Sequence, residues 1–105
     1  DEDSAAAFRR WLEGRYGTVE ALNEAWGTSF WSQTYYGWDE VNPPAAAPTF
    51  LNPAQQLDWR RFCSDALLEL YKTERDILRE VAPHVPATTN FIGVHNPLDE
   101  WRWAE

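Results

Sequence analysis

Histidine and cysteine, which often act as nucleophiles, bases or metal ligands, are few and widely spaced in this sequence. His84 lies in the turn PHVP and His95 precedes the segment NPLDE, and neither has companion ligands at the spacing of a metal site. Cys63 is the only cysteine, which excludes an intrachain disulfide and a thiolate metal cage. We expect both histidines at the surface and Cys63 as a small core residue of a helix. His95 keeps a role in ligand binding as an alternative, because it follows the end of an expected strand.

Aromatic side chains are the more unusual feature, and they concentrate in one segment. The chain holds seven Trp, four Tyr and five Phe. Six of these rings lie in residues 28–51, which also contain three prolines and one glycine and have no helical periodicity. We call this segment the aromatic loop. Such rings need a core, a partner surface or a flat ligand such as a sugar, and a loop of this length usually has a function or a partner.

The residues around the aromatic loop follow patterns of regular structure. Ser4 is suited to cap a first helix, Gly17 to end it, Gly27 to end a second helix, and Asn52 to cap a third. The expected elements are a helical hairpin at 5–26, a long helix at 53–82, a strand at 87–91 and a helix start at 97–105. The order of long helix, strand and helix indicates a piece of α/β architecture, although the segment itself is mostly α.

One strand cannot form a sheet by itself, because its backbone donors and acceptors stay unpaired at both edges. The strand at 87–91 must therefore pair with another copy of the chain or with neighbours outside it. The sequence contains no methionine, begins with DEDSAAAF and shows no signal-peptide pattern. We therefore expect a segment excised from a longer protein, and self-association of the excised piece.

Charge excludes several classes of partner. The 17 acidic and 9 basic residues give a net charge of −8, and the basic residues do not cluster. Nucleic acids and anionic membranes are therefore not expected as partners, and no apolar run approaches the ~20 residues that cross a bilayer. Along the long helix, charges of both signs alternate, Asp58 and Asp65 among them, which is typical of a solvated outer face. The protein is expected to be soluble and cytoplasmic.

Four blocks in order resemble consecutive blocks of glycoside hydrolase family 42, the β-galactosidases. The resemblance covers nearly the whole chain, and the string WGTSFWSQ is the most specific part of it. The blocks are AFRRWLEGRYGTVEALNEAWGTSFWSQ, LDWRRFCSDALLELY, ATTNFIG and PLDEWRWA. The resemblance implies a segment of a catalytic (β/α)8 barrel. It would comprise the helices after the fourth strand, the fifth strand at 87–91 and the start of the next helix.

The resemblance also implies a reaction, the hydrolysis of terminal non-reducing β-D-galactose residues with retention. Two glutamates act as acid/base and nucleophile, about 5 to 5.5 Å apart in retaining enzymes. In this family the acid/base belongs to an Asn-Glu pair upstream of position 1, and the nucleophile lies beyond Glu105. Asn23-Glu24 matches that pair by letters alone, but it sits within a helical pattern, and Glu24 is expected to be solvated. The segment therefore holds no catalytic residue and should be inactive alone.

The resemblance, with the barrel that it implies, points to two residues in substrate binding. Trp31 matches a tryptophan that, in trimeric members, reaches into the sugar pocket of a neighbouring subunit, and its alternative role is a core aromatic of the loop. Asn90 lies at the C-terminal end of the expected strand, which is where barrel active sites form. Some members bind zinc through cysteines just upstream of the first helix. Ser4 stands in place of the last of these, so no metal and no cofactor is expected.

The expected partners are a β-galactoside in the parent enzyme and further copies of the chain, which form trimers in the family. Two alternatives use the same aromatic residues without catalysis. One is a carbohydrate-binding module, and the other is a helical protein-interaction module with an exposed hydrophobic patch.

Overall fold

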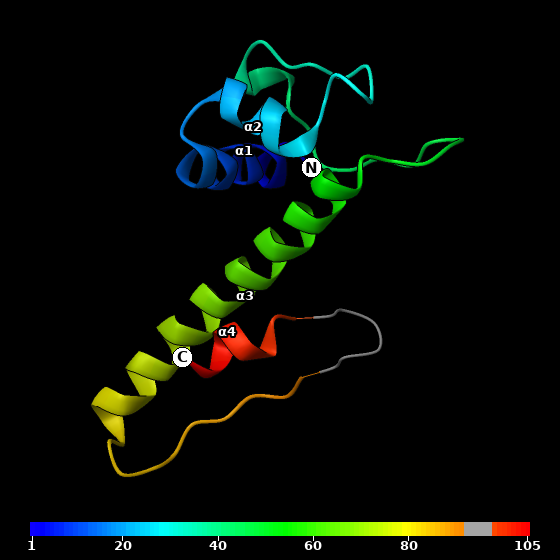
Figure 1. Ribbon diagram of the computed structural model, residues 1–105. Coiled ribbons are helices and arrows are strands. Elements are labelled where there is room, and N and C mark those ends of the chain that lie inside the picture. The colour runs from blue at the N-terminus through cyan, green and yellow to red at the C-terminus, as the bar shows by residue number, and fades with distance from the viewer. Residues whose placement is uncertain (92–97) are drawn as a thin grey trace. The chain divides into compact units, whose positions relative to one another are not determined.

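The computed structural model describes residues 1–91 and 98–105, and the regular structure in these ranges is helical (Figure 1). The elements are α1 (Glu2–Tyr16), α2 (Val19–Trp26), the 3-10 helix η1 (Trp38–Glu40), α3 (Pro53–Val81) and α4 (Glu100–Ala104). The chain divides into two compact units, Asp1–Trp59 and Arg60–Glu105. In the described ranges, no helix combines the length and the apolar character needed to cross a bilayer.

The first helix begins earlier than its sequence pattern predicts. We expected Ser4 to cap it, but Asp1 is the cap and accepts a 2.8 Å hydrogen bond from the Ser4 backbone nitrogen. Glu2 and Asp3 then occupy the first turn, where negative charge interacts favourably with the helix dipole. The alanine run therefore continues a helix that is already under way.

Glycine ends both helices of the hairpin, as the sequence predicts. Gly17 follows α1 with a φ of 79°, and Gly27 follows α2 in the left-handed conformation, with φ 59° and ψ 41°. Residues with a Cβ rarely adopt these angles, so glycine is the natural residue at both stops. Thr18 caps α2 by accepting a hydrogen bond from the Ala21 nitrogen.

The core of the first unit forms between the hairpin, the aromatic loop and the start of α3. Its fully buried apolar side chains are Phe8, Leu12, Leu22 and Val41, and Trp26 is only 3% exposed. Asn52 joins two helices, since its Oδ1 accepts from the Ala54 nitrogen at 3.0 Å and its Nδ2 donates to the Trp26 carbonyl at 2.9 Å. The cap of α3 is therefore also the link to the end of α2.

The second unit consists of the rest of α3 and the segments that follow. The Ser64 hydroxyl accepts hydrogen bonds from the Asp99 backbone nitrogen at 3.0 Å and from Trp103 Nε1 at 3.2 Å. Tyr71 stacks on the Trp103 indole with 5.6 Å between ring centres. These contacts hold α4 against α3, while other apolar side chains of α3, such as Ile77 and Val81, remain 57% and 81% exposed.

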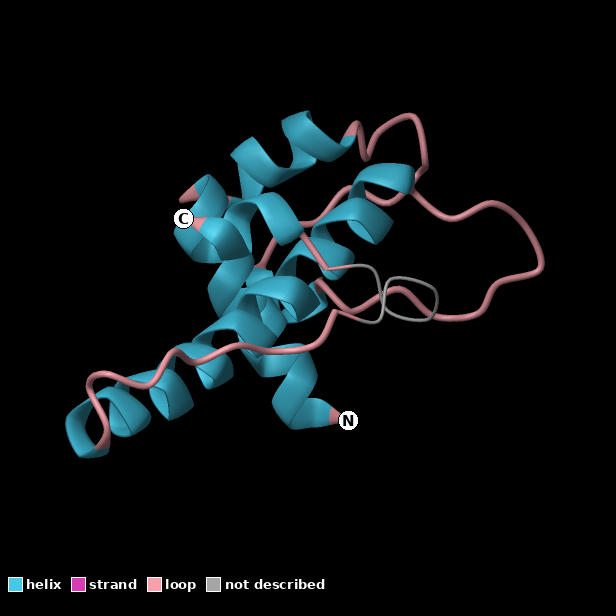
Figure 2. Ribbon diagram, turned by 90° about the horizontal axis from the view of Figure 1, so that it is seen from below, coloured by secondary structure: helices cyan, strands magenta, loops and turns pink. Residues whose placement is uncertain are grey.

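The strand expected at 87–91 is not formed. These residues are irregular and are drawn as loop in Figure 2, and the described residues contain no strand. A strand requires a partner edge for its backbone groups, and a single extended segment among helices has none. The expected start of a helix at 97 lies outside the described residues, and the helix that is observed, α4, is capped by Asp99.

Candidate functional site

The turn that carries Trp31 is the best-defined part of the aromatic loop. We call residues 27–33 the Trp31 turn. The Thr28 carbonyl oxygen accepts hydrogen bonds from the Trp31 nitrogen at 3.1 Å and the Gln33 nitrogen at 3.0 Å. Ser32 adopts a φ of 54° and is the residue other than glycine with positive φ in the described chain. The backbone on both sides of Trp31 is therefore closely specified.

Trp31 itself is half-buried and lies in an edge-to-face pair with Phe30. Their ring centres are 5.3 Å apart at 83°. Phe30 is 83% exposed, so the pair projects at the surface of the unit. A partly exposed ring of this kind has a polarisable apolar surface that suits the CH face of a pyranose.

Asn23 holds the aromatic loop and is not placed for acid/base chemistry. Its Nδ2 donates to the Tyr35 carbonyl at 2.7 Å, and its Oδ1 accepts from the Tyr35 nitrogen at 2.9 Å and the Thr28 hydroxyl at 2.8 Å. Glu24, its neighbour, is exposed on α2. The Asn23-Glu24 pair therefore has a structural asparagine and a solvated glutamate.

Asp58 is a buried carboxylate of α3. We expected it on a solvated helix face, but it is 1% exposed. Its Oδ2 accepts from the Tyr16 hydroxyl at 2.5 Å and from Trp26 Nε1 at 2.9 Å, and Arg15 Nε lies 3.7 Å from Oδ1. Alternation of charge along a helix cannot identify such a residue, because the partners come from elements far away in the sequence.

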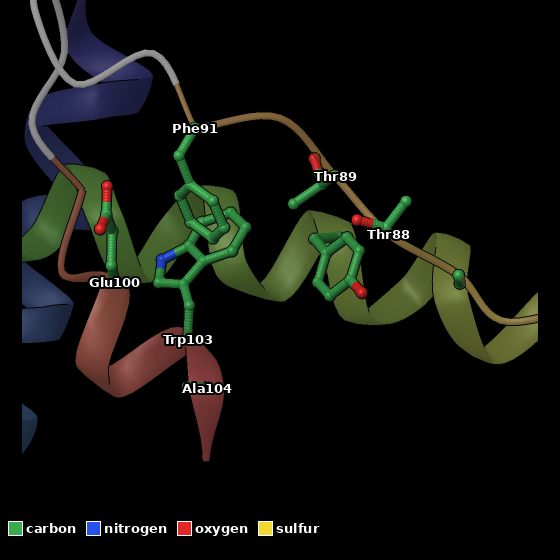
Figure 3. Close-up of a pocket in the computed structure, with 8 residues that line it drawn as sticks. Thr88, Thr89, Phe91, Glu100, Trp103 and Ala104 are labelled. Carbon is green, nitrogen blue, oxygen red and sulfur yellow. The ribbon is translucent and has the colours of Figure 1, made fainter.

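Asn90 lies in the second unit, on the irregular segment before α4. Its side chain is exposed, and it does not line the nearest cavity. Its neighbours do line that cavity, which has a volume of about 180 Å³. The lining residues are Tyr71, Ala87, Thr88, Thr89, Phe91, Glu100, Trp103 and Ala104. Phe91 and Trp103 lie close together at this cavity (Figure 3). Their rings form an edge-to-face pair with 5.3 Å between the ring centres.

A second hollow in this unit is lined by basic residues but is not an anion site. Its lining residues are Leu68, Lys72, Arg75, Arg102, Trp103 and Glu105. Each cation already has a carboxylate partner, and these pairs are Lys72–Glu69 at 2.9 Å, Arg75–Asp76 at 2.9 Å and Arg102–Asp65 at 2.6 Å. Their charge is therefore largely neutralised within the unit.

The remaining titratable residues have no arrangement typical of catalysis. His84 is exposed, and His95 lies outside the described residues. Cys63 is half-buried with a free thiol, and burial raises the pKa of that thiol above its ordinary value. Across 1–91 and 98–105, no three His, Cys, Asp or Glu side chains gather as metal ligands would.

Comparison with known proteins connects these features. The sequence model of glycoside hydrolase family 42, a family described as β-galactosidase, matches residues 1–105. The β-galactosidase bgaB of Geobacillus kaustophilus is 55% identical over 104 residues, which is 99% of this chain and 16% of that protein. A β-galactosidase from Arthrobacter is 53% identical over 106 residues, covering 99% of this chain and 15% of that relative.

Solved structures agree with the sequence comparison. The β-galactosidase of Halorubrum lacusprofundi superposes with a TM-score of 0.90 at 40% identity, over 99% of this chain and 16% of that one. The enzyme from Bacillus circulans sp. alkalophilus gives a TM-score of 0.86 at 46% identity, with the same coverage. The chain thus spans about one sixth of the length of these proteins. The expected fold class, a mostly helical segment of a (β/α)8 barrel, is confirmed apart from its strand.

All the proteins named above are β-galactosidases, so the two non-catalytic alternatives are not favoured. The match extends over the entire sequence, including both the Trp31 turn and the segment that carries Asn90. The chain belongs to glycoside hydrolase family 42, the β-galactosidase family.

Proposed function

We propose that this chain is part of a retaining β-galactosidase that hydrolyses terminal non-reducing β-D-galactose residues. The observation that carries the proposal is its 55% identity, across 99% of its length, to a protein named as a β-galactosidase. In this proposal both catalytic glutamates lie outside residues 1–105. The exposed position of Glu24 and the structural bonds of Asp58 support that placement.

The contribution of this chain is to substrate binding, through Trp31 and Asn90. Trp31 supplies a ring whose backbone is fixed and whose side chain is only half-buried. Asn90 supplies an exposed carboxamide that can donate to and accept from sugar hydroxyls. The ring recognises the apolar face of the pyranose, and the carboxamide recognises its polar edge. The assembled enzyme is a homo-oligomer in which the aromatic loop lies near a subunit contact.

The test is a hybrid enzyme. The 104 matching residues of the Geobacillus kaustophilus relative are replaced by this chain, and hydrolysis of o-nitrophenyl β-D-galactopyranoside is measured for the hybrid, the relative and this chain alone. We expect an active hybrid and an inert isolated chain. NMR of the first sugar released should show the β-anomer, as retention requires. A folded hybrid without activity, beside an active relative, would remove support for the proposal.

Two variants of the hybrid test the binding residues. Trp31→Ala should raise KM by about tenfold, since aromatic packing is worth ~0.5–1.5 kcal/mol beyond area burial and 1.4 kcal/mol is a factor of ten. Asn90→Ala should raise KM as well. Trp101→Ala, which removes an 82% exposed tryptophan elsewhere in the chain, is the matched control and should leave KM unchanged. Activity of the isolated chain would instead direct attention to Glu24, through Glu24→Gln.

A further inference from the structure

We infer that Asn23 is a positioning residue for galactoside binding, acting through Trp31 without touching the sugar. The inference rests on the proposed role of Trp31 and extends it to the residue that fixes the Trp31 turn. Asn23 lies on α2, outside the aromatic loop, and seven residues lie between it and Trp31 in the sequence. Hydrogen bonds connect its side chain to the loop segment that carries the ring.

The carboxamide of Asn23 holds the loop on both sides of Trp31. On the N-terminal side its Oδ1 accepts from the Thr28 hydroxyl at 2.8 Å. On the C-terminal side it bonds both backbone groups of Tyr35, at 2.9 Å to the nitrogen and 2.7 Å to the carbonyl oxygen. Paired bonds to one residue fix its orientation as well as its distance. One side chain therefore sets where the segment between Thr28 and Tyr35 begins and ends.

Thr28 passes this constraint to the Trp31 backbone. Thr28 is 1% exposed, and its nitrogen donates to the Asn23 carbonyl at 3.1 Å. Its own carbonyl oxygen accepts from the nitrogens of Trp31 and Gln33. The series of bonds thus runs from Asn23 to Thr28 and from Thr28 to Trp31, so a displacement at Asn23 reaches the backbone that carries the ring.

The residue after Trp31 has a backbone conformation that is unfavourable by itself, so the surrounding hydrogen bonds must stabilise it. Ser32, which follows Trp31, has a φ of 54°. This left-handed conformation is unfavourable for a residue with a Cβ, and it persists where the surroundings specify it. Here the Ser32 nitrogen donates to the Ser29 carbonyl at 3.3 Å, and the nitrogens of its neighbours Trp31 and Gln33 donate to the Thr28 carbonyl. Asn23 in turn holds the Thr28 hydroxyl. Without these hydrogen bonds the turn has reason to relax, and the direction of the Trp31 ring would change with it.

The fold of α2 itself does not depend on the Asn23 side chain. Thr18 caps the helix, Gly27 ends it, and Leu22 and Trp26 bury its apolar face. Replacement of Asn23 should therefore alter the Trp31 turn while the hairpin stays folded. This separation makes the inference testable by kinetics, because general unfolding and local misplacement of one ring have different signatures.

The experiment is a double-mutant cycle in the hybrid enzyme, with Asn23→Ala, Trp31→Ala and both together. We expect Asn23→Ala to raise KM three- to tenfold with kcat changed less than twofold. In the Trp31→Ala background it should have no further effect, because the ring through which it acts is gone. Effects on KM that simply multiply in the double variant would overturn the inference, since they would mean that Asn23 acts independently of Trp31.

Two further variants keep the outcome clear. Asn23→Asp retains the acceptor for Thr28 and Tyr35 but loses the donor, so it should raise KM less than Asn23→Ala. Should Asn23→Ala fail to fold, as judged by thermal unfolding, the cycle is run with Asn23→Asp under the same criterion. Asn42→Ala, an asparagine elsewhere on the aromatic loop, is the matched control and should leave KM as it was.

The two hypotheses fail differently. An unchanged KM in Trp31→Ala would contradict the proposed binding role of Trp31. An increased KM in Trp31→Ala, with an unchanged KM in Asn23→Ala, would overturn the positioning role alone.

Discussion

The Tyr16 hydroxyl donates a 2.5 Å hydrogen bond to Asp58, which lies 42 residues further along the chain. The same carboxylate oxygen accepts from the indole nitrogen of Trp26 at 2.9 Å. Three helices thus meet at one carboxylate, with Tyr16 at the end of α1, Trp26 at the end of α2 and Asp58 in the first turns of α3. Donors on rigid aromatic rings make this contact a fixed point of the first unit.

Replacement of Asp58 by alanine should lower the free energy of unfolding by about 2–4 kcal/mol. The loss is large because two buried donors would remain without their acceptor. Asp65→Ala is the matched control, since the pair of Asp65 with Arg102 is more exposed and such pairs contribute about 0.2–1 kcal/mol. Urea unfolding followed by tryptophan fluorescence compares the two. Equal losses of unfolding free energy in the two variants would show that the buried bonds of Asp58 stabilise the chain no more than the exposed ion pair does.

Stability should also decrease at high pH through Tyr16. Burial, followed by the hydrogen bond to Asp58, raises the pKa of Tyr16 above its ordinary value of 10.0. The folded chain therefore keeps this proton to higher pH than the unfolded chain does. The stabilisation is complete below pH ~10 and declines as the pH rises towards the folded-state pKa.

Measurement of the free energy of unfolding between pH 8 and pH 11 tests this dependence. Tyr16→Phe should be less stable than the unsubstituted chain at pH 8 and should lose stability less steeply above pH ~10. Tyr35→Phe offers a comparison, because burial also raises the pKa of Tyr35. Its removal should reduce the slope independently of Tyr16. If the free energy of unfolding of Tyr16→Phe fell with pH as steeply as that of the unsubstituted chain, the Tyr16 phenol would be excluded as a source of the pH dependence.

Substitutions of Ser32, which follows Trp31 and has a positive φ, should change stability according to the backbone preference of the new residue. Ser32→Gly removes a strain of ~1 kcal/mol but adds freedom to the unfolded chain, so the free energy of unfolding should change by less than about 1 kcal/mol. Ser32→Val should destabilise by more than about 1 kcal/mol, because a β-branched residue is poorly tolerated at positive φ. Ser29→Val, in the same turn, should change stability by less than about 0.5 kcal/mol. Thermal unfolding of the three variants provides the comparison.

Cys63 should react slowly with alkylating reagents. Burial raises the pKa of its thiol, which lowers the fraction of reactive thiolate at neutral pH. Iodoacetamide at pH 7.5 should modify the folded chain more slowly than the chain in 8 M urea, as followed by mass spectrometry. Rates that agree in both conditions would mean that the fold gives the thiol no protection.

Helix boundaries that depend on local chemistry were predictable from sequence. Gly17 and Gly27 end helices because of their backbone freedom, and Asn52 with Pro53 begins α3, where the long helix was expected. The start of α1 was not found, since both Asp1 and Ser4 are good caps and the pattern of apolar residues does not distinguish them. The prediction of a strand at 87–91 was wrong for another reason. β-branched residues indicate extended backbone, but a strand also requires a partner, and sequence preference supplies none.

The long-range bonds of the first unit left no signal in the sequence. The aromatic loop was expected to have no helical periodicity, and the structure shows one short 3-10 helix in it, η1. The attachment of the loop to Asn23, Arg9 and Gln55 through loop backbone groups leaves no periodic pattern in the sequence. For the same reason Asp58 was assigned to the surface. Side-chain bonds between segments 12 to 42 residues apart become visible only when the segments are folded together. The proposed role of Trp31 came from the family resemblance, whereas that of Asn23 came from its hydrogen bonds in the structure.

The part of the aromatic loop richest in proline and alanine has a practical consequence. Residues 45–50 are exposed, and the chain is held on either side of them, by the bond from Gln55 to the Asn42 carbonyl at 2.8 Å and by Asn52. Doubling the length of such a loop costs only ~0.6 kcal/mol in closure entropy. This stretch is therefore suited to accept an inserted epitope tag or fluorescent reporter, which would label the chain while leaving the Trp31 turn and its hydrogen bonds in place.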